Sequence, residues 1–329
     1  VRMQTFREGQ ALWISAAMRA ELRAESVPEP ETDEVLVRAL YSGISRGTEA
    51  LIYRHAVPAS EWQRMRAPFQ VGTLPGPVKY GYANVGRVLA GPAALIDRDV
   101  FCLYPHQTLF TVPVDAVLAL PPSVPAARAV LAANMETAVN ALWDARPSIG
   151  SRIVVIGAGV VGSLCAYLAA RIPGCEVCLV DIDPDRAELA RAFGASFALP
   201  TEVRGEADLV VHASASAAGL ALALSLSANE ATVLELSWYG DAPVSLPLGA
   251  AFHARRLKLI SSQVGQIGEG MRGRRVHRER LGLALSLLDD PKLDRLISGE
   301  SDFPQLPAAL PNVLGAQGRA LCHRVRYPW

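Results

Sequence analysis

Short apolar runs separated by proline, glycine and charged residues make up most of the first 120 residues. Some of these runs alternate apolar with polar positions and others are apolar throughout, and both patterns are typical of β-strands. The predicted strands cover residues 11–14, 34–39, 85–90, 100–103, 108–112 and 117–120. Many short strands joined by loops predict a small barrel-like β domain.

From residue 126 onwards, helices alternate with buried strands. Residues 126–145 have apolar positions at helical spacing, and residues 185–194 predict a helix that ends at Gly194. Strands are predicted at residues 153–156, 176–180, 196–199, 209–212, 232–236 and 257–261. This alternation predicts a six-stranded parallel sheet in an α/β domain.

The last part of the chain departs from this alternation. After Gln263 come a glycine-rich segment, a predicted helix at 280–289 and a final strand at 320–325. We expect that strand to return to the N-terminal β domain. The expected domains are therefore residues 1–122 with 267–329, and residues 123–266.

Two segments outside the regular pattern have more than one interpretation. Residues 54–77 form a long insertion with one or two helical turns at 61–66, and such insertions are often binding loops. Five arginines lie between residues 272 and 280. They could bind an anionic substrate or a phosphate, or they could form a solvated, charged entry to the helix that follows.

Composition narrows the classes of protein that remain. The chain has 329 residues, which suggests two domains, and 32 basic residues balance 32 acidic ones. We therefore expect no nucleic-acid partner. The five scattered cysteines and the lack of an apolar leader in residues 1–6 lead us to expect a cytoplasmic protein. The uncharged stretches 153–170 and 209–228 contain glycine or small polar residues, so we expect buried core and no membrane association.

A glycine motif follows the predicted strand 153–156. Its spacing is G-x-G-x-x-G, and a helix is expected to be established by Leu164. In this context the first glycine permits a tight turn, the second admits a pyrophosphate close to the backbone, and the third lets the helix pack on the strand. The expected phosphate-binding turn comprises Gly157, Gly159, Val160, Val161 and Gly162.

Asp181 ends the next predicted strand, 24 positions after Gly157. A carboxylate at about this spacing accepts hydrogen bonds from the ribose hydroxyls of a dinucleotide and repels a 2′-phosphate. The sequence therefore favours NAD over NADP as the cofactor. The alternative is an ordinary glycine-rich turn in which Asp181 only caps backbone groups.

These features together resemble the medium-chain dehydrogenase/reductase superfamily, the group that includes alcohol dehydrogenases. The resemblance covers nearly the whole chain and has three local matches, Ser42-Gly-Ile-Ser-Arg-Gly-Thr-Glu49, Gly81-Tyr-Ala-Asn-Val-Gly86 and Val180-Asp-Ile-Asp-Pro-Asp-Arg186. It implies a GroES-like β-barrel domain joined to a Rossmann domain with a doubly wound parallel sheet. Besides the glycine turn and Asp181, the cofactor-binding residues that it implies are Thr137, Arg186, Ser214, Ser237 and Gln263.

The chain departs from the zinc-dependent members of that superfamily at the expected ligand positions. Ser45 stands where a cysteine is expected, Tyr82 and Ala83 replace a His-Glu pair, and Ala133 occupies the third position. Cys175 and Cys178 are three apart on or beside a strand, so they point to opposite faces and we interpret them as core residues. We therefore predict that the protein binds no zinc.

Without a metal, another group must manage the proton that accompanies hydride transfer. The resemblance suggests Thr48, Tyr82 and Glu49 as the catalytic residues. Each also has a purely structural interpretation, in which Thr48 caps a turn, Tyr82 is half-buried and Glu49 bonds a backbone group or an arginine. His212, at the end of a buried strand, could contact the cofactor or serve as a core residue.

The expected function is zinc-independent, NAD(H)-dependent hydride transfer between a nicotinamide and an alcohol or carbonyl substrate of low molecular mass. An enone or quinone reductase of the same fold is one alternative, and a dinucleotide-binding redox sensor without enzymatic activity is another. The strand at 257–261 is apolar and is expected at the edge of the sheet, where pairing of two copies would satisfy its free backbone groups. We therefore expect a homodimer.

Overall fold

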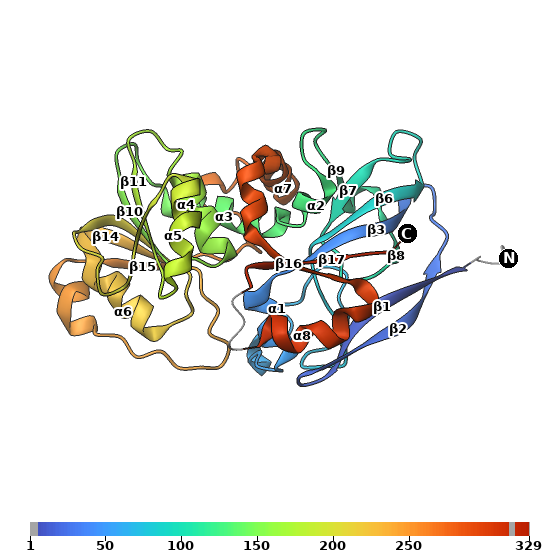
Figure 1. Ribbon diagram of the computed structural model, residues 1–329, viewed down its shortest axis with the longest axis horizontal. Coiled ribbons are helices and arrows are strands. Elements are labelled where there is room, and N and C mark those ends of the chain that lie inside the picture. The colour runs from blue at the N-terminus through green and yellow to red at the C-terminus, as the bar shows by residue number, and fades with distance from the viewer. Residues whose placement is uncertain (1–5, 316–319, 329) are drawn as a thin grey trace. The chain divides into compact units, whose positions relative to one another are not determined.

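The computed structural model describes residues 6–315 and 320–328, which fold into two compact units. The β unit consists of Val1–Ala133 with Leu285–Trp329, and the α/β unit consists of Asn134–Ala284. Figure 1 shows both units and labels most of their strands.

The β unit contains two mainly antiparallel sheets. The smaller sheet has the order β2-β1-β5-β4, and its strands are β1 (Phe6–Ala16), β2 (Arg19–Pro28), β4 (Val71–Gly72) and β5 (Val78–Lys79). The larger sheet has the order β16-β17-β3-β6-β7-β9, and β8 also pairs with β3. Its strands are β3 (Glu34–Ile44), β6 (Asn84–Ala90), β7 (Asp99–Cys102), β8 (Leu109–Pro113), β9 (Val117–Ala119), β16 (Ile297–Asp302) and β17 (Cys322–Arg326). The strands predicted in the first 120 residues are confirmed.

The C-terminal strand returns to the N-terminal part of the chain, as predicted. In β17, Val325 pairs with Ser42 of β3, and the two strands are antiparallel. The other flank of β17 pairs in parallel with β16. Helix α1 (Arg46–Tyr53) begins directly after β3, which places residues 45–49 at the end of a central strand of this sheet.

Several helix predictions in and near the β unit are wrong in detail. The predicted helix at 126–145 is interrupted at residues 130–131, where the backbone of β3 comes close at Gly43. It therefore forms two helices, α2 (Ala126–Ala129) and α3 (Ala132–Ala145). The segment 61–66 forms only the end of the 3-10 helix Ala59–Glu61 and then turns. Helix α8 (Leu306–Leu314) was not predicted, because two prolines lie within it.

The α/β unit is built around the predicted six-stranded parallel sheet. Its order is β12-β11-β10-β13-β14-β15, with five parallel pairings. The strands are β10 (Arg152–Ile156), β11 (Glu176–Val180), β12 (Ser196–Ala198), β13 (Ala207–His212), β14 (Ser227–Glu235) and β15 (Lys258–Ser261). The helices of the unit, beyond α3, are α4 (Val160–Ala169), α5 (Ala187–Phe193), α6 (Ala217–Leu226) and α7 (His277–Ser286).

Local signals account for most of these boundaries. Gly194 ends α5 in the left-handed conformation, at φ 86°, as the sequence predicted. Helix α4 begins at Val160, directly after the glycine turn and before the expected Leu164. Helix α7 begins earlier than predicted, and the part of the chain that was expected to end that helix is the 3-10 segment Leu287–Asp289.

Further short helical segments are Val114–Ala116, Pro184–Arg186, Leu248–Phe252, Glu269–Met271, Pro291–Leu296 and Phe303–Gln305.

The two uncharged stretches of the sequence are buried core, as predicted. Val154, Val210 and Val233 from three neighbouring strands pack with Leu220 and Leu224 of α6, and each is at most 9% exposed. Within the ranges that the structure describes, no helix is both long and apolar enough to cross a bilayer.

Candidate functional site

The glycine turn has the geometry that the motif predicts. Gly157 has a φ of 105°, and a Cβ atom there would lie 2.8 Å from the backbone of Ala213 and of Ser214. A Cβ atom on Gly162 would collide with the carbonyl oxygen of Gly157, so α4 packs against the turn. In contrast, a Cβ atom on Gly159 would meet nothing within 4 Å. The turn is therefore open at Gly159, where α4 presents its first N–H groups.

Asp181 lies beside this turn. Its Oδ2 atom accepts a hydrogen bond from the backbone N–H of Ala158 at 2.6 Å, and its Oδ1 atom accepts one from Asp183 at 2.9 Å. Arg186 is held 3.6 Å from Asp183. Both carboxylate oxygens of Asp181 cap backbone groups, and each oxygen still has a second lone pair that could accept from a ligand.

The carboxyl ends of β13 and β14 carry a hydrogen-bonded chain of three side chains. His212 is fully buried, and its Nε2 atom lies 2.7 Å from Ser214 Oγ. Its Nδ1 atom lies 2.8 Å from Glu235 Oε2. The backbone N–H of Ser237 donates to Glu235 Oε1 at 2.7 Å, and the hydroxyl of Tyr239 donates to Oε2 at 3.2 Å. His212 is therefore a core residue, which was one of its two interpretations. It also connects Ser214 with Ser237, two residues that were predicted to bind the cofactor.

Glu235 and Tyr239 of this cluster keep their ordinary charge states near neutral pH. Burial raises the pKa of Glu235, but the hydrogen bonds and charge of His212 and the hydrogen bonds of Ser237 outweigh that effect and lower it overall. Burial is also the main reason why the pKa of Tyr239 is raised. Glu235 therefore remains a carboxylate, and Tyr239 remains a neutral donor to it. Gly219 of α6 packs on the cluster, since a Cβ atom there would lie 2.5 Å from Ser214 Oγ.

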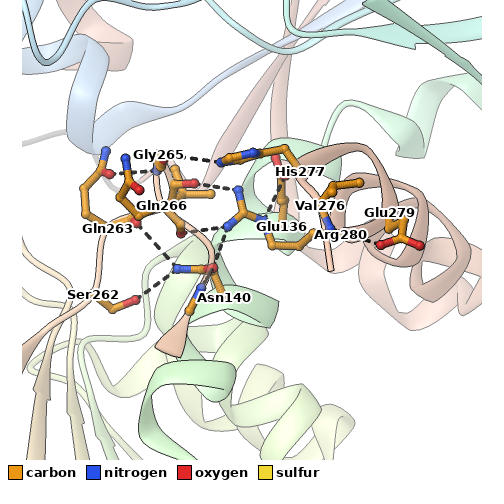
Figure 2. Close-up of polar contacts among 12 residues, drawn as sticks. Glu136, Asn140, Ser262, Gln263, Gly265, Gln266, Val276, His277, Glu279 and Arg280 are labelled. Carbon is orange, nitrogen blue, oxygen red and sulfur yellow. Dashed lines mark hydrogen bonds and ion pairs between the residues drawn. The ribbon is translucent and has the colours of Figure 1, made fainter. Parts of the chain in front are cut away.

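Two further residues that were predicted to contact the cofactor also lie in the α/β unit. Gln263 follows β15, and its Oε1 atom accepts a hydrogen bond from the N–H of Gly265 at 2.7 Å (Figure 2). Thr137 lies on α3 and is half-buried. Ser237 and Gln263 follow the neighbouring parallel strands β14 and β15, so they share the carboxyl edge of the sheet with Ser214. In open α/β sheets this edge is where ligands bind.

The β unit contains a second buried polar network. Glu49 on α1 accepts a hydrogen bond from the backbone N–H of Ser45 at 2.8 Å, and its other oxygen lies 3.0 Å from His106 Nε2. The Nδ1 atom of His106 lies 2.7 Å from Ser42 Oγ, which in turn lies 3.0 Å from the hydroxyl of Tyr327. The sequence suggested Glu49 but left the placement of His106 open and missed Ser42 and Tyr327.

Tyr82 contacts Thr48, and both residues were predicted to be catalytic. Its hydroxyl is hydrogen-bonded to the side chains of Ser45 and Thr48. Burial, and then the nearby charge of Glu49, raise the pKa of Tyr82 to about 12. Tyr82 is therefore a neutral hydroxyl at physiological pH. Thr48, Tyr82 and Glu49 thus lie close together.

The donor atoms in this region do not fit a zinc site. Ser45 and Tyr82 offer hydroxyl groups and Ala133 offers none, whereas zinc in proteins is held mainly by thiolate and imidazole. Cys322 is nearby, but burial raises the pKa of its thiol to about 12. In the part of the chain that the structure describes, no three His, Cys, Asp or Glu side chains form a possible metal site.

The arginine run divides into parts with different roles. Arg280 is 1% exposed; it contacts Glu136 and the carbonyl oxygen of Gln266, both at 3.0 Å, and also bonds Asn140 (Figure 2). It therefore ties the segment after β15 to α3. Arg275, in contrast, is exposed and lies 3.8 Å from Glu279.

Comparison with known proteins gives partial sequence matches and a full-length structural match. No protein-family model matches the chain. D-guloside 3-dehydrogenase of Escherichia coli is 27% identical over 186 residues, which are 51% of this chain and 52% of that protein. Probable D-xylulose reductase A of Emericella nidulans is 32% identical over 112 residues, 32% of this chain and 31% of that protein. The chain thus spans about half or less of the length of these curated relatives.

The solved structures match over nearly the whole chain. L-idonate 5-dehydrogenase of Escherichia coli has a TM-score of 0.80 and 14% identity, and the match covers 98% of this chain and 99% of that chain. A protein described as a short chain alcohol dehydrogenase of Escherichia coli, in complex with NADH, has a TM-score of 0.77 and 16% identity, over 97% and 99% of the two chains. A putative zinc-binding dehydrogenase of Sinorhizobium meliloti bound to NADP has a TM-score of 0.76 and 17% identity, with coverage of 97% and 99%. The chain therefore has the fold of these dehydrogenases.

Proposed function

We propose that this protein is an NAD(H)-dependent oxidoreductase of the medium-chain type, which interconverts an alcohol and a carbonyl compound without a catalytic zinc ion. The observation that carries this proposal is the open glycine turn with Asp181 beside it, in a fold shared with NADH- and NADP-bound dehydrogenases. The bound nicotinamide would supply or accept the hydride. All other steps fall to residues of the chain.

Cofactor binding begins at the glycine turn. The N–H groups at the start of α4 would hold the pyrophosphate, because a helix N-terminus carries a partial positive charge. Asp181 would accept from the ribose hydroxyls, and its negative charge would repel the extra phosphate of NADP. Arg186, Thr137, Val160 and Val161 are proposed to complete the contacts. The dehydrogenases with this fold bind either cofactor, so the preference for NAD rests on Asp181.

The residues at the carboxyl edge of the sheet are proposed to bind the nicotinamide half. Ser214, Ser237 and Gln263 present hydroxyl and amide groups there. His212 holds the Ser214 hydroxyl through Nε2 and is itself held by Glu235 through Nδ1. A ribose hydroxyl would then meet an oriented serine instead of a freely rotating one, which lowers the entropy cost of binding.

Proton transfer is proposed to use Tyr82 and Thr48. A neutral hydroxyl can donate a hydrogen bond to a carbonyl oxygen that gains negative charge as hydride arrives. The Tyr82 hydroxyl is tied to Thr48 and Ser45, so a proton given up by one group can be replaced by its neighbour. The charge of Glu49 disfavours the tyrosinate form and so keeps Tyr82 protonated.

The names of the relatives suggest the class of substrate. D-guloside, D-xylulose and L-idonate, the compounds in those names, all carry several hydroxyl groups. A secondary alcohol of a sugar or polyol, and the corresponding ketone, are therefore the first compounds to test. Oxidation of such alcohols with NAD⁺, followed at 340 nm, tests the proposal directly. Turnover of quinones or enones but not of polyols would favour the conjugated-carbonyl reductase, and NADH binding without turnover of any class would favour a redox sensor.

The proposed assembly is a homodimer joined through β15. This strand is the last in the sheet order, and among its residues Lys258 and Leu259 are exposed. One lysine gives weak protection against edge pairing. Two-fold pairing of this edge would close the assembly.

A further inference from the structure

A groove of about 550 Å³ opens on the α/β unit away from the predicted cofactor residues. It lies between the end of α3 and the segment 269–274. The residues that line the groove include Trp143, Arg146, Ile172, Met271, Arg272 and Arg274. This volume is in the range of sites that bind small molecules.

The position of the groove separates it from the carboxyl edge of the sheet. The glycine turn lies at the start of α4, whereas Ile172 follows the end of that helix. Ten helical residues span about 15 Å. The neighbouring Pro173 bonds to Gly150, just before β10 begins, so the groove lies near the amino edge of the sheet. A ligand in the groove would therefore not overlap a dinucleotide at the opposite edge.

Hydrogen bonds hold the segment 266–269, which leads into the wall at residues 269–274. Asn140 accepts a hydrogen bond from the N–H of Gly268 at 2.8 Å, and Asp144 accepts one from the N–H of Glu269 at 2.8 Å. On the same segment, Arg280 bonds the carbonyl oxygen of Gln266 (Figure 2). The groove is thus pre-formed, which reduces the ordering cost of binding.

The chemistry of the groove is basic on one side and apolar on the other. Of its three arginines, Arg146 is paired with Glu269 at 3.4 Å. The guanidinium groups of Arg272 and Arg274 form no hydrogen bond or ion pair with any described residue. Guanidinium groups match carboxylate and phosphate geometry, and an aromatic wall such as Trp143 matches a flat apolar body.

We propose that this groove is a second ligand site, selective for a small organic anion. The carboxylate or phosphate of the ligand binds Arg272 and Arg274, and its apolar part lies against Trp143 and Ile172. The site is separate from the proposed oxidoreductase chemistry and does not depend on it.

The test uses 8-anilinonaphthalene-1-sulfonate, a fluorescent aromatic anion, with the full chain and saturating NAD⁺, so that any probe at the cofactor site is displaced. We expect one saturable site, with energy transfer from tryptophan to the bound probe. The double variant Arg272→Ala/Arg274→Ala should weaken binding about tenfold or more, because two charge-assisted contacts are lost. The neutral analogue N-phenyl-1-naphthylamine should bind the wild-type chain about tenfold more weakly.

The control variant is Arg256→Ala/Arg275→Ala, which removes the same charge outside the groove. These arginines pair with Glu230 and Glu279 at the surface. Binding by this control should stay within about twofold of wild type, because exposed ion pairs contribute little. Absence of a saturable site in the presence of NAD⁺, equal losses in the two double variants, or equal binding of the neutral analogue would each overturn the proposal.

Discussion

His106 Nε2 lies 3.0 Å from Glu49 Oε2, and the two residues are 1% and 6% exposed. A buried carboxylate is stable only when its oxygens are hydrogen-bonded, and here Ser45 N–H and His106 satisfy both of them. The segments that resemble the metal-binding segments of zinc dehydrogenases thus contain a closed polar network instead. We infer that this network supports the neutral Tyr82 hydroxyl.

The first prediction concerns the stability of that network. Glu49→Ala should lower the free energy of unfolding by about 3 kcal/mol, because it leaves the buried His106 and the Ser45 N–H without their partner. Urea denaturation measures the change. Glu21→Ala is the control, since Glu21 pairs with Arg23 at the surface, and a loss below about 0.5 kcal/mol is expected there. Equal losses in the two variants would contradict the account.

The second prediction concerns proton transfer. Tyr82→Phe should lower kcat about 100-fold or more while the Kd for NADH stays within about twofold, because general-acid catalysis typically contributes at least that much. Steady-state kinetics on a polyol substrate, together with a fluorescence titration of NADH, measures both quantities. Tyr41→Phe is the matched control and should keep wild-type kcat. If Tyr82→Phe retained full kcat, Tyr82 would have a structural role only.

The third prediction concerns Glu235, whose pKa is lowered from its ordinary value of 4.5 in the folded chain. A carboxyl group whose pKa is lower in the folded chain than in the unfolded chain stabilises the folded state when the pH is above the unfolded-state pKa. This stabilisation is lost as the pH falls through the folded-state pKa. Glu235→Gln should therefore be less stable than wild type at pH 7, and the difference should shrink below about pH 4.5. Unfolding at several pH values measures it. A difference that stayed constant or grew on acidification would refute this role.

The fourth prediction concerns metal. Purified protein should contain no stoichiometric zinc, because Ser45, Tyr82 and Ala133 lack thiolate and imidazole donors. Elemental analysis and activity after chelation test this. One zinc ion per chain, removed by the chelator together with activity, would show that the donor argument is wrong.

Much of the fold was predictable because its core strands are unambiguous. Buried parallel strands such as β10 and β13 are continuous apolar runs, and Gly194 marks a helix end. Strand β2 was missed because two of the three apolar positions in its alternating Arg-Ala-Glu-Leu-Arg-Ala run are alanines, which favour strands weakly, and β16 because its Ser-Gly-Glu-Ser centre is polar. These strands depend on pairing with β1 and β17, which a local pattern does not reveal.

The candidate site was predictable only where its signals are local. The glycine turn and Asp181 lie within one strand-turn-helix-strand segment and follow known spacing rules. The partners of His212 and Glu49 are far apart in sequence, since Glu235 lies 23 positions from His212 and His106 lies 57 from Glu49. Their contacts require the register of β13 with β14 and the packing of α1. Glu235, at the end of β14 and within the predicted strand 232–236, was a local signal that could have indicated a buried partner.

The most direct test of the proposed function is a titration of the wild-type chain and of Asp181→Ala with NADH and NADPH, followed by quenching of tryptophan fluorescence. The account predicts that wild type binds NADH at least about tenfold more tightly than NADPH, since one charge-assisted hydrogen bond is gained and one phosphate repulsion is avoided. Asp181→Ala should narrow that ratio to near one. Tighter binding of NADPH by wild type, or no binding of either dinucleotide, would contradict the account.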